Sequence, residues 1–184
     1  MTDVEIASGR KRCNLRADLV ADSKGATAVE FALVAVPFLA LIVALIQTFL
    51  VFFAQELLES VVQQSSRLIL TGQVQSQQMT QSAFQQAVCN QVVILFNCNG
   101  LMVDVQVANT WSSANTSAPT LTFNAQGQVA NAWQFNPGTT GDIVVVRVMY
   151  QWPVFLGPLG FNLSNLSNGN RLIMASAAFQ NEPS

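Results

Sequence analysis

Residues 24–55 read KGATAVEFALVAVPFLALIVALIQTFLVFFAQ, and this stretch decides the fold. Every residue from 31 to 55 is uncharged, and Pro37 is the only helix breaker in that run. At about 1.5 Å per residue, a helix over the run is longer than the roughly 30 Å hydrocarbon layer of a bilayer. Membrane helices tolerate proline as a kink. The run therefore predicts one transmembrane helix.

Basic residues gather on one side of this run. Five of the eight lie in the first 24 residues, at Arg10, Lys11, Arg12, Arg16 and Lys24. The next basic residue is Arg67, beyond the run. Because positively charged flanks stay on the cytoplasmic side, we expect a cytoplasmic N-terminus and an exported remainder. A cleaved secretory signal is the alternative, but its apolar core of about 7–15 residues is far shorter than this run.

The helical pattern continues beyond the apolar run. Apolar or small side chains recur on one helical face at Leu57, Leu58, Val61, Val62, Ser65, Leu68 and Ile69. This spacing predicts one long helix from about 26 to 71, with Gly72 as its stop. We expect the stripe to pack on the protein's own domain. A second helix is predicted over 77–96, with Ser76 as its N-cap.

Three segments have the patterns of strands. Apolar and polar residues alternate over 101–108, which predicts a half-buried strand. The β-branched run 142–152 suits a central strand, 171–180 is a third candidate, and 120–124 is a weaker one. The expected fold class is α+β: the long N-terminal transmembrane helix continues into an exported domain, residues 56–184, with a second helix and a small antiparallel sheet.

The cysteines fit an exported domain. Cys89 and Cys98 both lie in the part expected outside the cytoplasm, where a disulfide can form and persist, whereas Cys13 lies in the part expected inside. We therefore predict a Cys89–Cys98 disulfide. The plainer interpretation is a pair of buried thiols. Zinc binding is disfavoured because the chain has no histidine and the two cysteines lack close ligand spacing.

The residues around the start of the run carry a resemblance to a known family. The sequence GATAVEFALVAVPFLALIVALIQ is similar to the N-terminal region of the TadE-like family. These are minor pilin-like proteins of the tight-adherence (Flp) pilus apparatus, in which glycine precedes a helix with Glu-Phe. The segments LMVDVQV, DIVVVRVMYQWP and AAFQNEP are also similar to later parts of that family, whereas the region 108–141 is not.

The resemblance implies a processing step and an assembly step. In that family, a membrane-embedded aspartic prepilin peptidase cuts after the glycine. Here the cut would fall between Gly25 and Ala26, directly after Lys24. The matching glutamate is Glu30, followed by Phe31. In pilin-like proteins this glutamate meets the N-terminal amine of a neighbouring subunit, so the resemblance implies an ion pair between Glu30 and the freed Ala26 amine of a neighbour.

Elementary chemistry supports roles for the same two positions. Gly25 has no side chain and resists helix formation, so it would give a peptidase an extended, accessible backbone. The plainer interpretation is a glycine that merely ends a flexible leader. A carboxylate at the hydrocarbon edge costs on the order of a few kcal/mol unless paired, which makes Glu30 a functional candidate. Alternatively, Glu30 reaches the lipid headgroups, about one turn away.

The sequence lacks the common signatures of catalysis. It has no histidine, no GxSxG motif and no Walker-type glycine loop. No paired or metal-ligand spacing links the exported acids, which are Glu56, Glu59, Asp104, Asp142 and Glu182. We expect no catalytic residue, no metal and no cofactor, so the chain is not expected to be an enzyme. Only three basic residues follow residue 55, too few for a nucleic-acid groove.

Together with these sequence features, the resemblance implies a prepilin-like structural component of a tight-adherence pilus. Residues 1–25 form a cleaved cytoplasmic leader, 26–55 the transmembrane helix and 56–184 a pilin-like exported domain. The expected partners are a prepilin peptidase, other pilin-like subunits with their assembly machinery, and the lipid bilayer. The expected location is the bacterial inner membrane, single pass, with a periplasmic domain, and incorporation in or at the tip of a pilus stays open. The alternative function is an unprocessed, membrane-anchored envelope protein whose exported domain binds a ligand or partner.

Overall fold

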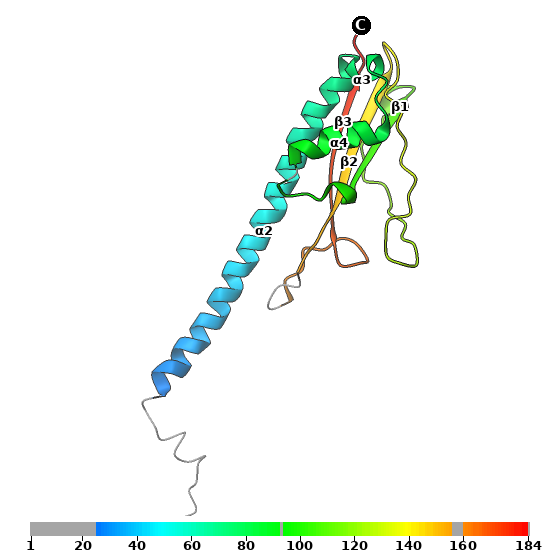
Figure 1. Ribbon diagram of the computed structural model, residues 1–184. Helices are drawn as coiled ribbons and strands as arrows, with labels where there is room; N and C mark the ends of the chain where they lie inside the picture. Colours follow the sequence, from blue (N-terminus) through cyan, green and yellow to red (C-terminus); the bar gives the residue numbers. More distant parts are fainter. Residues whose placement is uncertain (1–24, 93, 156–159, 184) are drawn as a thin grey trace, which may run out of the picture. The chain divides into compact units, whose positions relative to one another are not determined.

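The computed structural model describes residues 25–92, 94–155 and 160–183, so most of the predicted leader, including Lys24, lies outside the described residues. The helical elements are α2 (Ala26–Leu70), α3 (Gln73–Ser76), α4 (Gln81–Val92) and the 3-10 turns η1 (Cys98–Gly100) and η2 (Trp111–Ser113). The strands are β1 (Leu101–Ala108), β2 (Ile143–Trp152) and β3 (Arg171–Gln180) (Figure 1). The predicted α+β class is confirmed.

Helix α2 is the long helix that the apolar run predicted. It runs unbroken for 45 residues with Pro37 inside it. The helix crosses the boundary between two compact units, which falls between Ile42 and Val43. It ends where expected: Gly72 has a left-handed φ of 72° and donates its N–H to the Ile69 carbonyl at 3.0 Å. Glycine adopts this conformation without steric cost, which is why the helix stops there.

The second helix is shorter than the sequence predicted. Helix α4 spans Gln81–Val92 rather than 77–96, and Ser76 ends α3 instead of capping α4. The reason is Val74, which is buried: the Met79 N–H donates to the Val74 carbonyl at 3.0 Å, and the chain turns there before α4 begins. Thr80 takes the capping role, because its hydroxyl accepts a hydrogen bond from the Ala83 N–H at 3.2 Å.

The sheet has three antiparallel strands in the order β1-β2-β3, so β2 is central as predicted. Its register aligns Val105 with Val146 and Val146 with Ala177. The weak candidate 120–124 does not form a strand of the sheet: in that region the structure has an isolated bridge between Phe123 and Val129. A short alternating pattern does not make a strand unless a neighbour is placed to pair with it.

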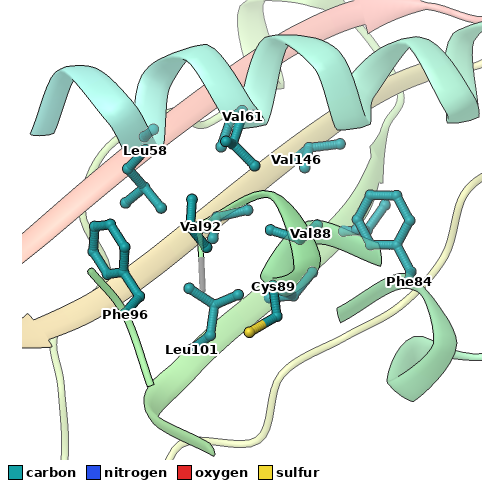
Figure 2. Close-up of a cluster of buried hydrophobic side chains, with 14 of the residues drawn as sticks. Leu58, Val61, Phe84, Val88, Cys89, Val92, Phe96, Leu101 and Val146 are labelled. Atoms are coloured by element: carbon teal, nitrogen blue, oxygen red, sulfur yellow. The ribbon is translucent and has the colours of Figure 1, made fainter. Parts of the chain in front are cut away.

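One face of the sheet packs against the helices and forms the core. Figure 2 shows Leu58 and Val61 of α2 pointing toward Val92 of α4, with Val146 of β2 beside them. The side chains of this cluster without exposure are Ala54, Leu58, Val62, Ile69, Phe84, Val88, Cys89, Val105, Val144, Val146 and Val148. The stripe predicted on α2 therefore packs on the protein's own domain, which removes its apolar side chains from water.

Candidate functional site

The residues predicted for processing and assembly lie at the start of α2. Gly25 is in a turn, and the first helical hydrogen bond runs from the Val29 N–H to the Gly25 carbonyl at 3.2 Å. The peptide bond to Ala26 thus lies where a turn becomes a helix. Glu30 and Phe31 follow within the first turns, and both are exposed, with Phe31 at 74%. Each is therefore free to contact lipid or another chain.

The segment of α2 that follows has an exposed apolar surface. Its large exposed side chains are Val29, Phe31, Leu33, Val34, Val36, Phe38, Leu39, Leu41, Val43, Leu45, Ile46, Phe49, Leu50, Phe52 and Phe53. In length and composition α2 can cross a membrane, and no other helix in the described part of the chain can. So much exposed apolar surface on a soluble monomer is rare, and it marks a contact with lipid or protein.

The same helix changes its surroundings after this exposed segment. Phe53 is 47% exposed, whereas Ala54 in the next position and Leu58 one turn later have no exposure. From Ala54 to Ile69 one face of α2 lies in the core, whereas the charged side chains Glu56, Glu59 and Arg67 are exposed. Ser65 and Ser66 are the buried polar side chains of this segment. A single continuous helix therefore combines a segment for an apolar environment with a segment that holds a folded domain.

Cys89 and Cys98 are disulfide-bonded, with their Cα atoms 5.5 Å apart. Cys89 lies on the buried face of α4 (Figure 2), and Cys98 opens η1, immediately before β1. The bond ties the end of α4 to the start of β1, so the helix keeps its place over the sheet. Disulfides persist in oxidising compartments, which is where the sequence analysis expects this domain.

The face of the sheet that points away from the helices contains a buried ion pair. Asp104 of β1 and Arg147 of β2 are directly opposite in the register, and they are 1% and 7% exposed. The Arg147 Nε and Nη2 atoms donate to Asp104 Oδ2 at 3.0 and 2.5 Å. It is the one ion pair among the residues that the structure describes.

The loop between β1 and β2 covers this ion pair. The Gln134 N–H donates to Asp104 Oδ1 at 2.9 Å, and the Arg147 Nη1 donates to the Ser117 carbonyl at 3.5 Å. The Ser176 hydroxyl of β3 donates to the Thr116 carbonyl at 3.3 Å. The loop is thus held across the sheet by polar contacts, on a face that also buries the apolar side chains of Met102, Val145 and Met149. The pair is a structural feature, since its charged atoms are occupied within the protein.

A polar cleft of about 600 Å³ lies beside the outer edge of β1. Two glutamines of α4 reach this edge: Gln85 donates to the Leu101 carbonyl at 2.6 Å, and Gln81 donates to the Val103 carbonyl at 3.1 Å. Another lining amide, Asn131, bonds Thr122 across the loop. The amide N–H groups of Gln81 and Gln85 and the Asn131 carbonyl oxygen already have partners inside the protein.

No group of three or more His, Cys, Asp or Glu residues in the described ranges could hold a metal ion. The features that remain are the exposed apolar segment, the glycine and glutamate at its start, and the domain held by the second part of the helix. They define a class of protein: an α+β domain carried on a candidate membrane-spanning helix.

Residues 25–67 match the family described as TadE-like protein. The match starts at Gly25 and runs through the exposed segment into the buried part of α2, so it confirms the resemblance over this helix and leaves the sheet outside it. The family is associated with the Tad pilus and its pilin-like proteins. Comparisons with curated proteins and with solved structures gave no match.

Sequence reasoning missed the Asp104–Arg147 pair and the two glutamines on the β1 edge. A signal for the pair was present, since each residue is the one charge within a mostly apolar strand. Charges in such strands are rarely buried alone, which points to a partner. For Gln81 and Gln85 the signal was weaker: their spacing of four places them on one helical face, but nothing local identifies the carbonyls that they reach.

Proposed function

We propose that the protein is a pilin-like structural subunit of a tight-adherence pilus, clipped after Gly25 and then assembled through α2. The observation that carries this proposal is the exposed apolar segment of α2, which begins one helical turn after a glycine in a turn and continues into a docked domain. Such a helix suits both lipid and a bundle of like helices, because each offers an apolar surface.

The first step is removal of the leader, residues 1–25, by a prepilin peptidase. Gly25 supports this step because it lies outside the helix, where a protease can hold the backbone extended. The cut frees the amine of Ala26 at the first position of α2. We propose that the helix then spans the inner membrane with its N-terminus on the cytoplasmic side and its domain in the periplasm.

The second step is bundling with other pilin-like subunits. Glu30 is exposed on α2, so its carboxylate is available to the Ala26 amine of a neighbouring chain. When the helix leaves lipid for such a bundle, the Glu30 carboxylate pairs with that amine, and the apolar side chains around it pack on other helices. The domain then determines which subunit lies beside it. The role is structural, and no step requires turnover of a substrate.

The test is the intact mass of the membrane-extracted protein, expressed with and without the prepilin peptidase of its system. We expect loss of residues 1–25 only when the active peptidase is present. Gly25→Trp should keep its full mass, because the bulky side chain obstructs the cut. Gly25→Ala is the matched control: it adds only one methyl group, so a larger fraction of it should be cut than of Gly25→Trp. An unchanged mass for the wild-type chain under both conditions would instead favour the unprocessed, membrane-anchored envelope protein.

A further inference from the structure

The connection between β2 and β3 contacts α2 at Gln47. The Gln47 Nε2 donates to the Phe155 carbonyl at 3.2 Å, although the two residues are 108 positions apart. Around this bond is a small apolar cleft of about 100 Å³, lined by Leu50 and Val51 of α2 and by Trp152, Phe155 and Leu163. The domain therefore reaches down α2 as far as the apolar run itself.

This contact falls near the end of the hydrocarbon layer that a bilayer would offer α2. A span of about 20 residues that starts at Phe31 ends near Leu50. Gln47 lies roughly 13 Å before Glu56, the first charge after the run, at 1.5 Å per helical residue. If α2 crosses a bilayer, Phe155 lies at the boundary between acyl chains and headgroups, on the side where the domain is.

The side chains at this end of the domain suit that boundary. Phe155 is 74% exposed even though its carbonyl is bonded to α2, so its ring is presented outward. Trp152 is held in place by Phe96 and Tyr150, whose ring centroids are 5.8 and 6.4 Å from its own. Aromatic rings that are apolar on one side and polar on the other concentrate at membrane interfaces.

Charge at this end of the domain also favours a lipid surface. Arg171 is opposite Trp152 in the register of β2 and β3, and its Nη1 donates to the Leu163 carbonyl at 2.9 Å. The sequence has no acid between Asp142 and Glu182, so this connection has no carboxylate to repel anionic lipid. Arg171 is partly exposed, and a guanidinium beside interfacial aromatic rings is well suited to a lipid phosphate.

We propose that residues 152–155 and 160–163, together with Arg171, form a lipid-facing seat on which the exported domain rests. Phe155 enters the edge of the acyl layer, Trp152 lies at the interface, and Arg171 contacts lipid phosphate. The seat is continuous with the exposed apolar surface of α2 through Leu50, which lines the same cleft and is 39% exposed. It rests on the proposed membrane span, and it adds a second contact with the bilayer that a subunit must release when it leaves the membrane.

The test uses the full-length chain in vesicles of phosphatidylethanolamine and phosphatidylglycerol, with bromine placed either near the headgroup or near the tail of the acyl chain. Trp111, Trp133 and Trp152 are replaced by Phe, and one reporter is introduced as Phe155→Trp. We expect its emission to shift to the blue and to be quenched by bromine near the headgroup more than by bromine near the tail. A chain that keeps only Trp152 repeats the measurement with a native ring.

Two reference chains separate the possible failures. Phe38→Trp in the same background reports on the span and should be quenched, whereas a chain with Trp111 alone reports on an exposed part of the domain and should not be. If the reporter at position 155 is as unquenched as Trp111 while the one at 38 is quenched, the seat is wrong and the span stands. A blue shift of the emission from the reporter at position 155 that occurs only when pilin-like subunits are added would also overturn the lipid seat. Loss of quenching at 38 would refute the span itself.

Discussion

Arg147 donates two hydrogen bonds to a single oxygen of Asp104, across the central pair of strands and almost out of reach of water. The two residues are 43 positions apart, and the register of β1 and β2 brings them opposite each other. The other Asp104 oxygen accepts from the Gln134 N–H. The carboxylate thus links the sheet to the loop that covers it.

Removing one partner of this pair should be costly. Arg147→Met leaves a buried carboxylate without its cation, and we expect the free energy of unfolding to fall by about 3–5 kcal/mol. The measurement is guanidinium unfolding of the full-length protein in detergent, followed by near-UV circular dichroism. The double variant Asp104→Asn/Arg147→Met should recover part of the loss. The matched control Arg67→Met removes an exposed arginine and should change stability little; equal losses in the two single variants would argue against the pair.

The disulfide should stabilise the domain mainly by restricting the unfolded chain. Its sequence separation of 9 residues corresponds to about 2–3 kcal/mol of loop entropy. We expect the free energy of unfolding of Cys89→Ala/Cys98→Ala to fall by at least this amount. Reduction of the wild-type protein should lower it by the contribution of the bond alone. Cys13→Ala is the control and should leave unfolding unchanged. A reduced wild type as stable as the oxidised protein would show that the bond contributes nothing.

Gln85 should stabilise the outer edge of β1. Gln85→Ala removes the donor to the Leu101 carbonyl, and loss of such a bond costs about 1 kcal/mol. The unpaired carbonyl also makes the edge more accessible to other chains, so earlier self-association on concentration is expected, measurable by light scattering. Gln86→Ala is the control, because Gln86 is exposed and bonds only Asn90 of its own helix. Identical behaviour of the two variants would contradict this role for Gln85.

The Asp142 carboxylate should stabilise the fold at neutral pH and lose this effect in acid. Hydrogen bonds to its carboxylate from the Thr139 N–H (2.7 Å) and then from the Thr139 hydroxyl (2.9 Å) hold its pKa below the ordinary value. A lowered pKa in the folded state stabilises the fold above the unfolded pKa of about 3.9, and this stabilisation disappears as the pH falls through the folded value. Wild type should therefore exceed Asp142→Asn in stability at pH 7, and the difference should vanish near pH 2. A difference that stays constant over this range would rule out the carboxylate as its source.

Glu30 is predicted to act in assembly rather than in processing. Glu30→Ala should still lose residues 1–25 in the presence of the peptidase, because the side chain lies beyond the cut, yet it should fail to co-purify with pilin-like partners. Glu30→Asp retains the charge on a side chain that is one methylene shorter, and it should keep part of the co-purification with pilin-like partners. Undiminished co-purification of Glu30→Ala would indicate that the carboxylate only meets lipid headgroups.

The strands could be predicted because their patterns are local and strong. Alternation over 101–108 predicted β1, and the β-branched run 142–152 predicted β2 to within a residue. The expectation that β1 is half-buried was wrong, because the loop between β1 and β2 covers its polar face and both faces are buried from Leu101 to Val105. The cap of α4 could not be predicted in the same way. Ser76 and Thr80 are both acceptable N-caps, and the burial of Val74 against distant residues selected Thr80.

Local spacing along the chain determined the long apolar helix, its stop at Gly72 and the alternating faces of the strands, because each depends only on residues within a few positions of one another. Tertiary structure alone decided that Asp104 meets Arg147 and that Phe155 lies against Gln47. These contacts join residues far apart in sequence, and they follow from strand register and from the packing of a sheet on a helix. No local period encodes that information, because it arises only when the whole apolar face leaves water together.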